Sequence, residues 1–509
     1  MISFRSLPRI IVKAWPSVLS IFAGIYVLGI MLAQARPGYF YSVDGGFKYL
    51  MIQQYLKGDF STSLPSSRSA LQQALWDAGC YPYTPPYVFT KSSDRVPAFP
   101  LYFPLLTTPF VKLFGFYGLH ILPVIGLVAT WILLAVAARR HRFGRWPVLM
   151  GMLSLTIASP LTIYGALFWE HSLAAFFAAI PIVVLMPDER LVRPKTAMLA
   201  GIAAGLGVFL RPEMLPLLPI LVLLAALFRE RAARPVLICF GTGVTLSFAA
   251  FFALNTVFYS HPLGCHVLNV VGEERITPSF WTSLFDRTPD LIMLFAKHFP
   301  FGVAFLFFAF WPAFRQSRRI CYLASSLPLI LVGIALIVPN NGGLQWGPRY
   351  FLPLVPWFSY AVMAMLARLR QTGSSPLCIS VTSTIIIHLL WCVNENTRNA
   401  FYHLQYYNHI SYGPSISFLA EAKETHFVFP DSCSANWAFL DQEKEFYRCA
   451  YANDINNLVH RLKEHGVNSC LYVSFHLTPP CHPGYSAEPL EHDASEVVIY
   501  RLSARTTDP

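Results

Sequence analysis

The sequence holds a small set of polar residues in apolar surroundings whose side chains have the chemistry of a catalytic or binding site. Carboxylates can act as general bases, guanidinium groups can hold phosphate, and an imidazole can bind metal or transfer protons. Charged groups inside or at the edge of a membrane are costly, and this makes each of them a candidate for function. The residues are Asp44, Lys48, Glu170, His171, Arg211, Glu213, Arg349 and Tyr350.

Asp44 lies in the stretch YSVDGGFKYLMIQQYLKGD, beside two glycines. Gly45 and Gly46 let the backbone turn sharply and leave the carboxylate uncovered. From Phe47 onward, apolar residues recur at helical spacing. Asp44 is therefore either the N-cap of that helix or a catalytic base, and one carboxylate can serve as both.

Two further pairs of charged residues interrupt apolar runs. Glu170 and His171 open such a run, where an acid suits a helix N-terminus, but an acid and an imidazole that face a cavity can also bind metal or move protons. Arg211 and Glu213 lie at a break between two apolar helices. They are read either as a buried ion pair at a kink or as part of a site.

The loop NNGGLQWGPRYFLP, residues 340–353, separates two long apolar runs. Arg349 offers a planar fork of N–H donors that suits phosphate. Trp346 and Tyr350 can stack on a sugar ring or lie at the level of lipid headgroups, and Gln345 adds a polar side chain. The loop predicts a site for an anion beside a flat polar ligand, and the alternative is an ordinary interfacial loop.

Arg95 precedes a proline-rich apolar segment, residues 99–115. Its cation is placed to reach a lipid phosphate, and a solvated loop is an equal interpretation. We expect the segment after it to dip into the membrane or lie along its surface. A full crossing there would invert every later cluster of basic residues relative to the membrane.

The composition is that of a membrane protein. Hydrophobic residues make up 55% of the 509 residues, charged residues make up 13%, and the mean hydropathy is +0.47. A soluble domain carries about twice that charged fraction. Apolar stretches of about twenty residues recur along the first four fifths of the chain, which predicts a polytopic helical domain.

The net charge of +11 predicts membrane orientation rather than nucleic-acid binding. Lys and Arg gather in short clusters between apolar runs, and such loops mark the cytoplasmic side. The main clusters are Arg139 to Arg145, Arg190 to Lys195, Arg229 to Arg234, Arg315 to Arg319, and Arg368 with Arg370.

A topology that keeps these clusters inside has about eleven transmembrane helices. It places the N-terminus in the cytoplasm, the C-terminus outside, and all eight polar residues named first at the outer face. Residues 196–228 also fit two short helices that meet part-way through the membrane. The predicted spans are 14–33, 119–138, 147–163, 168–187, 196–211, 212–228, 235–256, 299–314, 320–338, 352–368 and 377–393.

The sequence predicts two domains. Residues 1–395 form the transmembrane domain, whose first outer loop covers 34–98. Residues 396–509 alternate strand-like and helical patterns, which predicts a small extracytoplasmic α/β domain. Four cysteines in this domain fit one or two disulfides in an oxidising compartment, and they are Cys433, Cys449, Cys470 and Cys481.

No nucleotide-binding loop is present in the sequence. An enzyme with an outer-facing site therefore needs an activated donor that arrives through the membrane, and a lipid-phosphate-linked sugar meets that condition.

At this point the sequence resembles the integral-membrane glycosyltransferases of the C-type fold (GT-C), which use polyprenyl-phosphate sugar donors. The likeness covers residues 1–395 and is greatest to bacterial mannosyltransferase- and arabinosyltransferase-like members. Its motifs occur in the expected order: VDGGFKYLMIQQ, PAFPLYFPLLTTPFVKLFG, FWEH with LRPE, and GGLQWGPRYFLPLVP.

The resemblance implies roles for the candidate residues. Asp44 would act as general base or help to bind a metal, and Glu170 would supply a second carboxylate. Arg349, and with it Lys48, Arg95 or Arg211, would hold the donor phosphate. A glycine follows Asp44 where many members have a second acid, so a divalent metal stays an open expectation.

The resemblance also implies a setting. The protein would lie in a bacterial inner membrane with its C-terminal domain in the periplasm, and its acceptor would be a glycan, a lipid or a protein. Two other functions share an outer cationic site: a lipid or glycan transporter or flippase, and an O-antigen polymerase or ligase. A third alternative is a non-catalytic assembly protein whose outer α/β domain binds a partner. Charge-free mid-sections of the spans favour the enzyme over the transporter.

Overall fold

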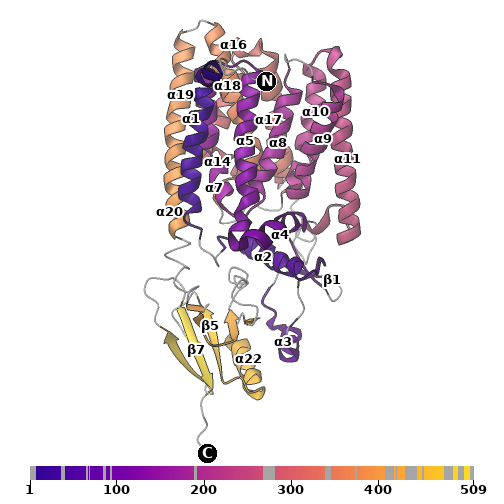
Figure 1. The fold of residues 1–509 in the computed structure, drawn as a ribbon, viewed down its shortest axis with the longest axis vertical. Coiled ribbons are helices and arrows are strands. Elements are labelled where there is room, and N and C mark those ends of the chain that lie inside the picture. The colour runs from indigo at the N-terminus through magenta and orange to yellow at the C-terminus, as the bar shows by residue number, and fades with distance from the viewer. Residues whose placement is uncertain are drawn as a thin grey trace, which may run out of the picture. The chain divides into compact units, whose positions relative to one another are not determined.

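The fold is taken from a computed structural model and consists of two compact units (Figure 1). The helical unit contains Met1–Ala33, Leu119–Gly264 and Arg275–Phe401. The loop-and-sheet unit contains Gln34–Gly118, Cys265–Glu274 and Tyr402–Pro509. The structure describes residues 7–35, 40–64, 67, 69–83, 87–91, 94–187, 192–266, 281, 283–338, 346–372, 375–406, 418–419, 421–429, 444–449, 452–474, 485–490 and 498–504.

The helical unit is built from apolar helices interrupted by short breaks. Its first half contains α1 (Leu7–Leu32), α5 (Ile121–Arg140), α6 (Arg145–Thr156), α7 (Leu161–Ala166), α8 (His171–Leu185), α9 (Pro194–Leu210), η4 (Pro212–Met214), α10 (Leu217–Phe228) and α11 (Arg234–Tyr259). Its second half contains η7 (Ser283–Arg287), α14 (Thr288–His298), α15 (Phe301–Ala309), α16 (Pro312–Arg315), α17 (Arg318–Ile337), η8 (Arg349–Leu354), α18 (Val355–Thr372), α19 (Ser375–Val393) and η9 (Asn394–Asn399). After η9 the chain continues as α20 (Ala400–Gln405).

Each of the eleven predicted spans contains a helix, but eleven membrane crossings are not confirmed. Within the described residues, six helices are long and apolar enough to cross, or seven if the bent pair α14–α15 counts as one span. Helices α8, α9 and α10 are apolar but shorter. The predicted span 147–163 is interrupted between Thr156 and Leu161, because Pro160 disfavours helical backbone at the residue before it.

Helices α9 and α11 approach each other closely through glycines. A Cβ added to Gly201 would lie 2.1 Å from the carbonyl oxygen of Phe240. A Cβ added to Gly243 would lie 2.3 Å from the carbonyl oxygen of Met198. Small residues at such a crossing let two helix backbones pack in contact, which is the main source of association between helices in lipid.

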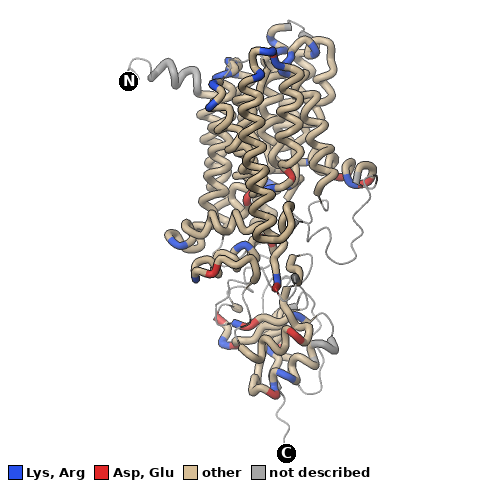
Figure 2. The backbone as a smooth tube through the Cα atoms, turned by 90° about the vertical axis from the view of Figure 1, so that its right-hand side faces the viewer, with Lys and Arg blue, Asp and Glu red and all other residues tan. Residues whose placement is uncertain are grey.

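Lys and Arg gather at one end of the helical unit (Figure 2). Arg140 ends α5 and Arg145 begins α6, so the connection between these helices lies at that end. Helix α8 ends and α9 begins there as well, on either side of Arg193. The start of α8 and the end of α9 therefore lie toward the opposite end of the unit.

The loop-and-sheet unit begins with α2 (Val43–Leu56), which packs against α4 (Tyr102–Phe114). Between them the chain forms α3 (Ala70–Leu75), η2 (Trp76–Cys80) and a hairpin of β1 (Val88–Lys91) with β2 (Asp94–Pro97). η3 (Gly115–His120) then leads into α5. The first outer loop of the sequence analysis is thus a folded segment whose described part contains α2, α3, η2 and a hairpin.

The C-terminal part of this unit is a five-stranded sheet with the order β4-β3-β5-β7-β6. β3 pairs in parallel with β4 and β5, whereas β7 pairs antiparallel with β5 and β6. This sheet, with helix α22 (Ala452–Glu464), confirms a small C-terminal α/β region. The strands are β3 (His426–Phe429), β4 (Glu445–Arg448), β5 (Ser469–Ser474), β6 (Tyr485–Leu490) and β7 (Val498–Ala504).

The core between α22 and the sheet also contains residues of the first loop. Leu75 and Trp76 are buried in it together with Tyr447 and Leu458. The indole nitrogen of Trp76 donates to the carbonyl oxygen of Phe446 at 3.1 Å. The loop that follows α2 and the C-terminal sheet are therefore parts of one folded unit.

Cys470 lies in the same core as a free thiol, and burial raises its pKa to about 12. This thiol does not take part in the predicted disulfides. Cys449 is buried nearby, whereas Cys433 and Cys481 lie outside the described residues.

We expect Gly201→Val to lower the thermal stability of the purified protein in detergent. The new side chain would overlap the Phe240 carbonyl, and overpacking of this kind costs about 1 to 3 kcal/mol or more. Gly241→Val is the matched control, because a Cβ at Gly241 would meet only Val222, at 3.7 Å. Equal losses of Tm in the two variants would contradict the close α9–α11 crossing.

Candidate active site

The helical unit contains a buried cluster of charged residues, the carboxylate clamp, formed by Arg211 with Glu170 and Glu213. Arg211 Nη1 lies 3.1 Å from Glu170 Oε1, and Nη2 donates to Glu213 Oε1. All three side chains are buried. The ion pair that the sequence analysis proposed at this break is present, and Glu170 joins it from a preceding segment.

Helix ends bring these three residues together. Pro212 favours extended backbone at Arg211, where φ is −139° and ψ is 98°, so α9 ends there and η4 begins. Glu170 occupies the position before α8 and makes no side-chain cap bond. Its carboxylate instead pairs with Arg211 across the contact of α8 with α9.

Arg349 and Tyr350 extend the clamp from the start of η8. The guanidinium carbon of Arg211 lies 5.5 Å from the centre of the Tyr350 ring, and that of Arg349 lies 4.9 Å from it. Arg349 Nη2 also donates to the Tyr350 hydroxyl at 3.0 Å. Two guanidinium groups therefore border one phenol ring, and with two carboxylates the formal charges of the cluster balance.

His171 is buried at the start of α8 among aromatic rings. Its ring centre lies 4.8 Å from that of Tyr164 and 5.4 Å from that of Trp169. In the part of the chain that the structure describes, no three His, Cys, Asp or Glu side chains are grouped to hold a metal ion. A role for His171 in proton transfer stays a prediction.

Trp346 is held by contacts within the helical unit. Its carbonyl oxygen accepts from the Tyr164 hydroxyl at 2.7 Å, and its indole nitrogen donates to Asn396 Oδ1 at 3.4 Å. Its ring meets the imidazole of His298 edge to face, with 5.2 Å between ring centres. These contacts favour a structural role over stacking on a ligand. Gln345 lies outside the described residues.

Gly347 follows with a backbone that favours glycine. Its φ is 67°, in the left-handed region, and a Cβ there would lie 3.3 Å from both Pro160 and the His298 ring. The segment that leads to Arg349 is therefore closely confined on both sides.

In the loop-and-sheet unit, Asp44 lies in the first turn of α2 and is half-buried. Ser42 occupies the N-cap position, so the alternative that Asp44 is the N-cap is wrong. Lys48 lies one turn later on the same face of the helix. It is 2% exposed, with its ammonium 5.6 Å from the centre of the Phe99 ring.

Arg95 is engaged with the aromatic residues of its own unit. Its guanidinium carbon lies 3.8 Å from the centre of the Tyr81 ring and 5.0 Å from that of Trp76. Its Nη2 is 3.7 Å from a carboxylate oxygen of Asp77. A role for Arg95 in binding a donor phosphate stays a prediction.

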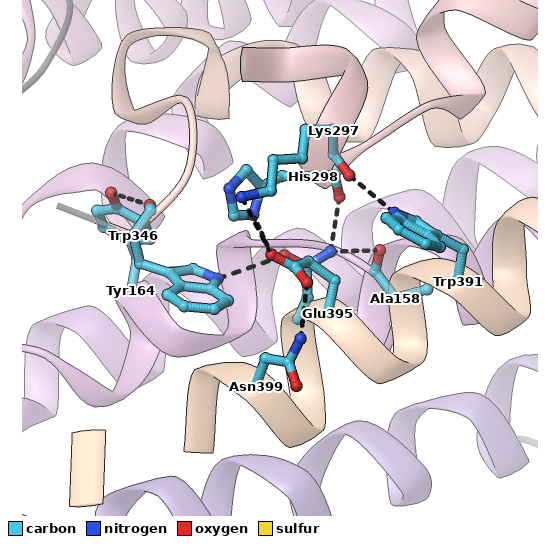
Figure 3. Close-up of polar contacts among 9 residues, drawn as sticks. Ala158, Tyr164, Lys297, His298, Trp346, Trp391, Glu395 and Asn399 are labelled. Atoms are coloured by element: carbon cyan, nitrogen blue, oxygen red, sulfur yellow. Dashed lines mark hydrogen bonds and ion pairs between the residues drawn. The ribbon is translucent and has the colours of Figure 1, made fainter. Parts of the chain in front are cut away.

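A second polar cluster, which the sequence analysis did not identify, surrounds η9 (Figure 3). Glu395 Oε1 lies 3.8 Å from His298 Nδ1 and 3.9 Å from Lys297 Nζ, and its other oxygen accepts from Asn399 at 2.8 Å. Asn396 is fully buried beside it. The available signal was the polar run NENTRN directly after the last apolar stretch.

Comparison with known proteins identifies the fold. No protein-family model matches the sequence, and no curated protein matches it. Among solved structures, ArnT from Cupriavidus metallidurans matches with a TM-score of 0.55 and 13% identity, over 95% of this chain and 97% of that chain. The same enzyme bound to undecaprenyl phosphate matches with a TM-score of 0.54 and 11% identity, over the same shares of both chains.

The archaeal oligosaccharyltransferase AglB from Archaeoglobus fulgidus is also similar. Its complex with an inhibitory peptide and a dolichol-phosphate matches with a TM-score of 0.51 and 13% identity, over 91% of this chain and 70% of that chain. These structures have the C-type glycosyltransferase fold. The fold that the sequence resemblance implied is therefore confirmed for this chain.

We expect Arg211→Ala to destabilise the protein strongly. Removing one partner of a buried ion pair leaves uncompensated charge, here two carboxylates, at a cost of about 3 to 5 kcal/mol. Thermal unfolding of the purified protein in detergent would measure the loss. The control is Arg318→Ala, because Arg318 and Glu230 form an exposed pair at 3.3 Å that is worth about 0 to 1 kcal/mol. If Arg211→Ala lost no more thermal stability than Arg318→Ala, the result would indicate that Arg211 is solvated.

Proposed function

We propose that the protein is a membrane glycosyltransferase. It would move a sugar from a polyprenyl-phosphate donor to an acceptor at the outer face of the membrane in which it lies. The observation that carries the proposal is the pair of guanidinium groups, Arg211 and Arg349, that border Tyr350 in a chain with this fold. Undecaprenyl phosphate bound to ArnT and dolichol-phosphate bound to AglB support a lipid phosphate as the ligand.

Arg349 is the residue that best suits the donor phosphate. The Arg211 guanidinium is buried and already pairs with two carboxylates. Arg349 is half-buried, and its guanidinium donates to the Tyr350 hydroxyl. A guanidinium fork can hold two phosphate oxygens at once, and it stabilises the negative charge that grows on the leaving phosphate.

Asp44 is the proposed general base. The hydroxyl of the acceptor must lose a proton as it attacks the anomeric carbon of the sugar, and a half-buried carboxylate can accept that proton. Glu170 contributes indirectly, because it holds Arg211 in place. Next to Asp44 the sequence has Gly45 and not the second acid that would complete a pair of carboxylates for a metal ion. No step is therefore assigned to a metal.

The orientation and domain limits belong to the same proposal. The basic end of the helical unit would face the cytoplasm, because short Lys- and Arg-rich loops stay inside. The start of α8 and the end of α9 would then face outward in a bacterial inner membrane. Residues 1–395 would form the catalytic domain and 396–509 a periplasmic domain, with a glycan, lipid or protein as acceptor.

We expect Asp44→Asn to lower the rate of sugar transfer by about 10²- to 10⁴-fold, which is the usual contribution of a general base. Arg349→Ala should also lower the rate of transfer, because the donor phosphate loses the guanidinium group that binds it. The measurement is transfer from synthetic polyprenyl-phosphate sugars by the purified protein in nanodiscs. Asp59→Asn is the control, since Asp59 is an exposed acid just after α2 whose carboxylate accepts from Gln54.

Transfer that is unchanged in both variants would place the active site elsewhere. Absence of transfer with any donor would favour a transporter, and a lipid-flipping measurement on the same nanodiscs would then test that function directly.

A single displacement with one base predicts inversion at the anomeric carbon of the transferred sugar. The acceptor oxygen attacks from the face opposite the leaving phosphate, and no covalent sugar–enzyme intermediate forms. An NMR spectrum of the product that showed the donor configuration retained would refute the one-step reaction.

A further inference from the structure

Asn396 connects four segments of the helical unit through one side chain. Its Nδ2 donates to the carbonyl oxygen of His298 at 2.6 Å and to that of Ala158 at 3.3 Å. Its Oδ1 accepts from the indole nitrogen of Trp346 at 3.4 Å. The side chain is fully buried in η9, so these bonds form away from water.

The two carbonyl groups that Asn396 satisfies lie at helix breaks. His298 ends α14, and α15 continues from Phe301 at an angle of 107°. Ala158 lies in the interruption between α6 and α7. Carbonyl groups at helix ends lack intrahelical partners, and a buried one without a partner costs about 1 to 3 kcal/mol. Asn396 therefore stabilises both breaks and at the same time holds Trp346.

Trp346 begins the segment that ends at the proposed phosphate ligand. The Tyr164 hydroxyl holds its carbonyl oxygen, and Asn396 holds its indole. Gly347 is confined between Pro160 and the His298 ring, and Pro348 has a restricted φ. A displacement of Trp346 is thus passed on to Arg349 through two residues with little freedom to absorb it.

The contacts of Glu395 stabilise the same segment, residues 346–349, through His298. Its carboxylate lies beside the His298 imidazole and accepts from Asn399 one turn away. The imidazole in turn packs against Trp346 and Gly347. Helix η9, which carries Glu395 and Asn396, is a π-helix. π-Helices are frequent at functional sites.

We propose that Asn396 is a positioning residue for donor binding, which sets the Arg349 guanidinium by fixing residues 346–349 through Trp346. The proposal rests on the proposed function for the identity of the ligand, a polyprenyl phosphate. It assigns Trp346 to holding this segment and not to stacking on the sugar. A displacement of about 1 Å in an element that positions a substrate can lower the rate about 10²-fold. We therefore expect loss of the three hydrogen bonds of the Asn396 amide to weaken donor binding measurably.

The test measures binding of undecaprenyl phosphate alone to the full-length protein in nanodiscs. Asn396→Leu removes all three hydrogen bonds at similar volume and should raise the Kd about tenfold or more. Trp346→Phe removes the indole N–H and part of the ring but keeps the backbone carbonyl that accepts from Tyr164, so it should raise the Kd less. Thr397→Ala is the matched control, because Thr397 lies in the same turn and its hydroxyl donates to the Ile157 carbonyl oxygen at 2.7 Å and not to residues 346–349.

A double-mutant comparison separates positioning from general destabilisation. If Asn396 acts through Arg349, Asn396→Leu should not weaken binding further in an Arg349→Ala background. Independent effects that multiply in the double variant would overturn the proposal. So would an equal rise in Kd for Thr397→Ala.

Hydrogen exchange of the peptide that covers residues 346–352 gives a readout that does not depend on function. The amides of Arg349 and Phe351 donate to Gly347 and Pro348, and Asn396→Leu should speed their exchange while Thr397→Ala leaves it unchanged. Unchanged exchange in Asn396→Leu would overturn the inference. A wild-type protein that binds no undecaprenyl phosphate would overturn the proposed function, and the exchange rates would still decide whether Asn396 fixes the segment.

Discussion

The desolvation of Arg211 is the constraint on which the arrangement of the helical unit depends. A guanidinium is always charged, and its removal from water costs several kcal/mol unless carboxylates compensate for it. Glu213 supplies part of that compensation from the same break, whereas Glu170 can reach Arg211 only if the start of α8 lies beside the end of α9. The clamp therefore fixes which helix ends meet, and it determines where Tyr350 and Arg349 can lie.

The candidate site is made of helix breaks that are stabilised by side chains. Chains in lipid must satisfy every backbone group internally, so a break is tolerated only where another group replaces the lost bonds. Arg211 lies at one break, and Asn396 bonds to the carbonyl groups of two others. The same breaks bring polar side chains into an apolar bundle, which is how a largely hydrophobic sequence can build a reactive surface.

The sequence predicted the parts of this structure that depend on local patterns. Apolar runs located the helices, and the closeness of Arg211 to Glu213 along the chain predicted their ion pair. It did not predict Asn396, because its partners are backbone carbonyls 98 and 238 residues away, and any residue can supply a carbonyl. Strands β4 and β6 are harder to predict from sequence, because they lie at the two edges of the sheet with one pairing partner each and β6 contains a proline.

The short separation of Arg211 from Glu213 bears on how the chain enters the membrane during synthesis. Helices α9 and α10 are shorter than the helices that are long enough to cross a membrane, and Arg211 lies at the break between them. An unpaired Arg in a membrane helix costs about 2.5 to 3.5 kcal/mol on insertion. Because Glu213 pairs with Arg211 from only two residues away, it can reduce that cost within the same chain segment. Glu170 then pairs with Arg211 when α8 packs against α9. The same guanidinium group would therefore matter both during membrane insertion and in the final site.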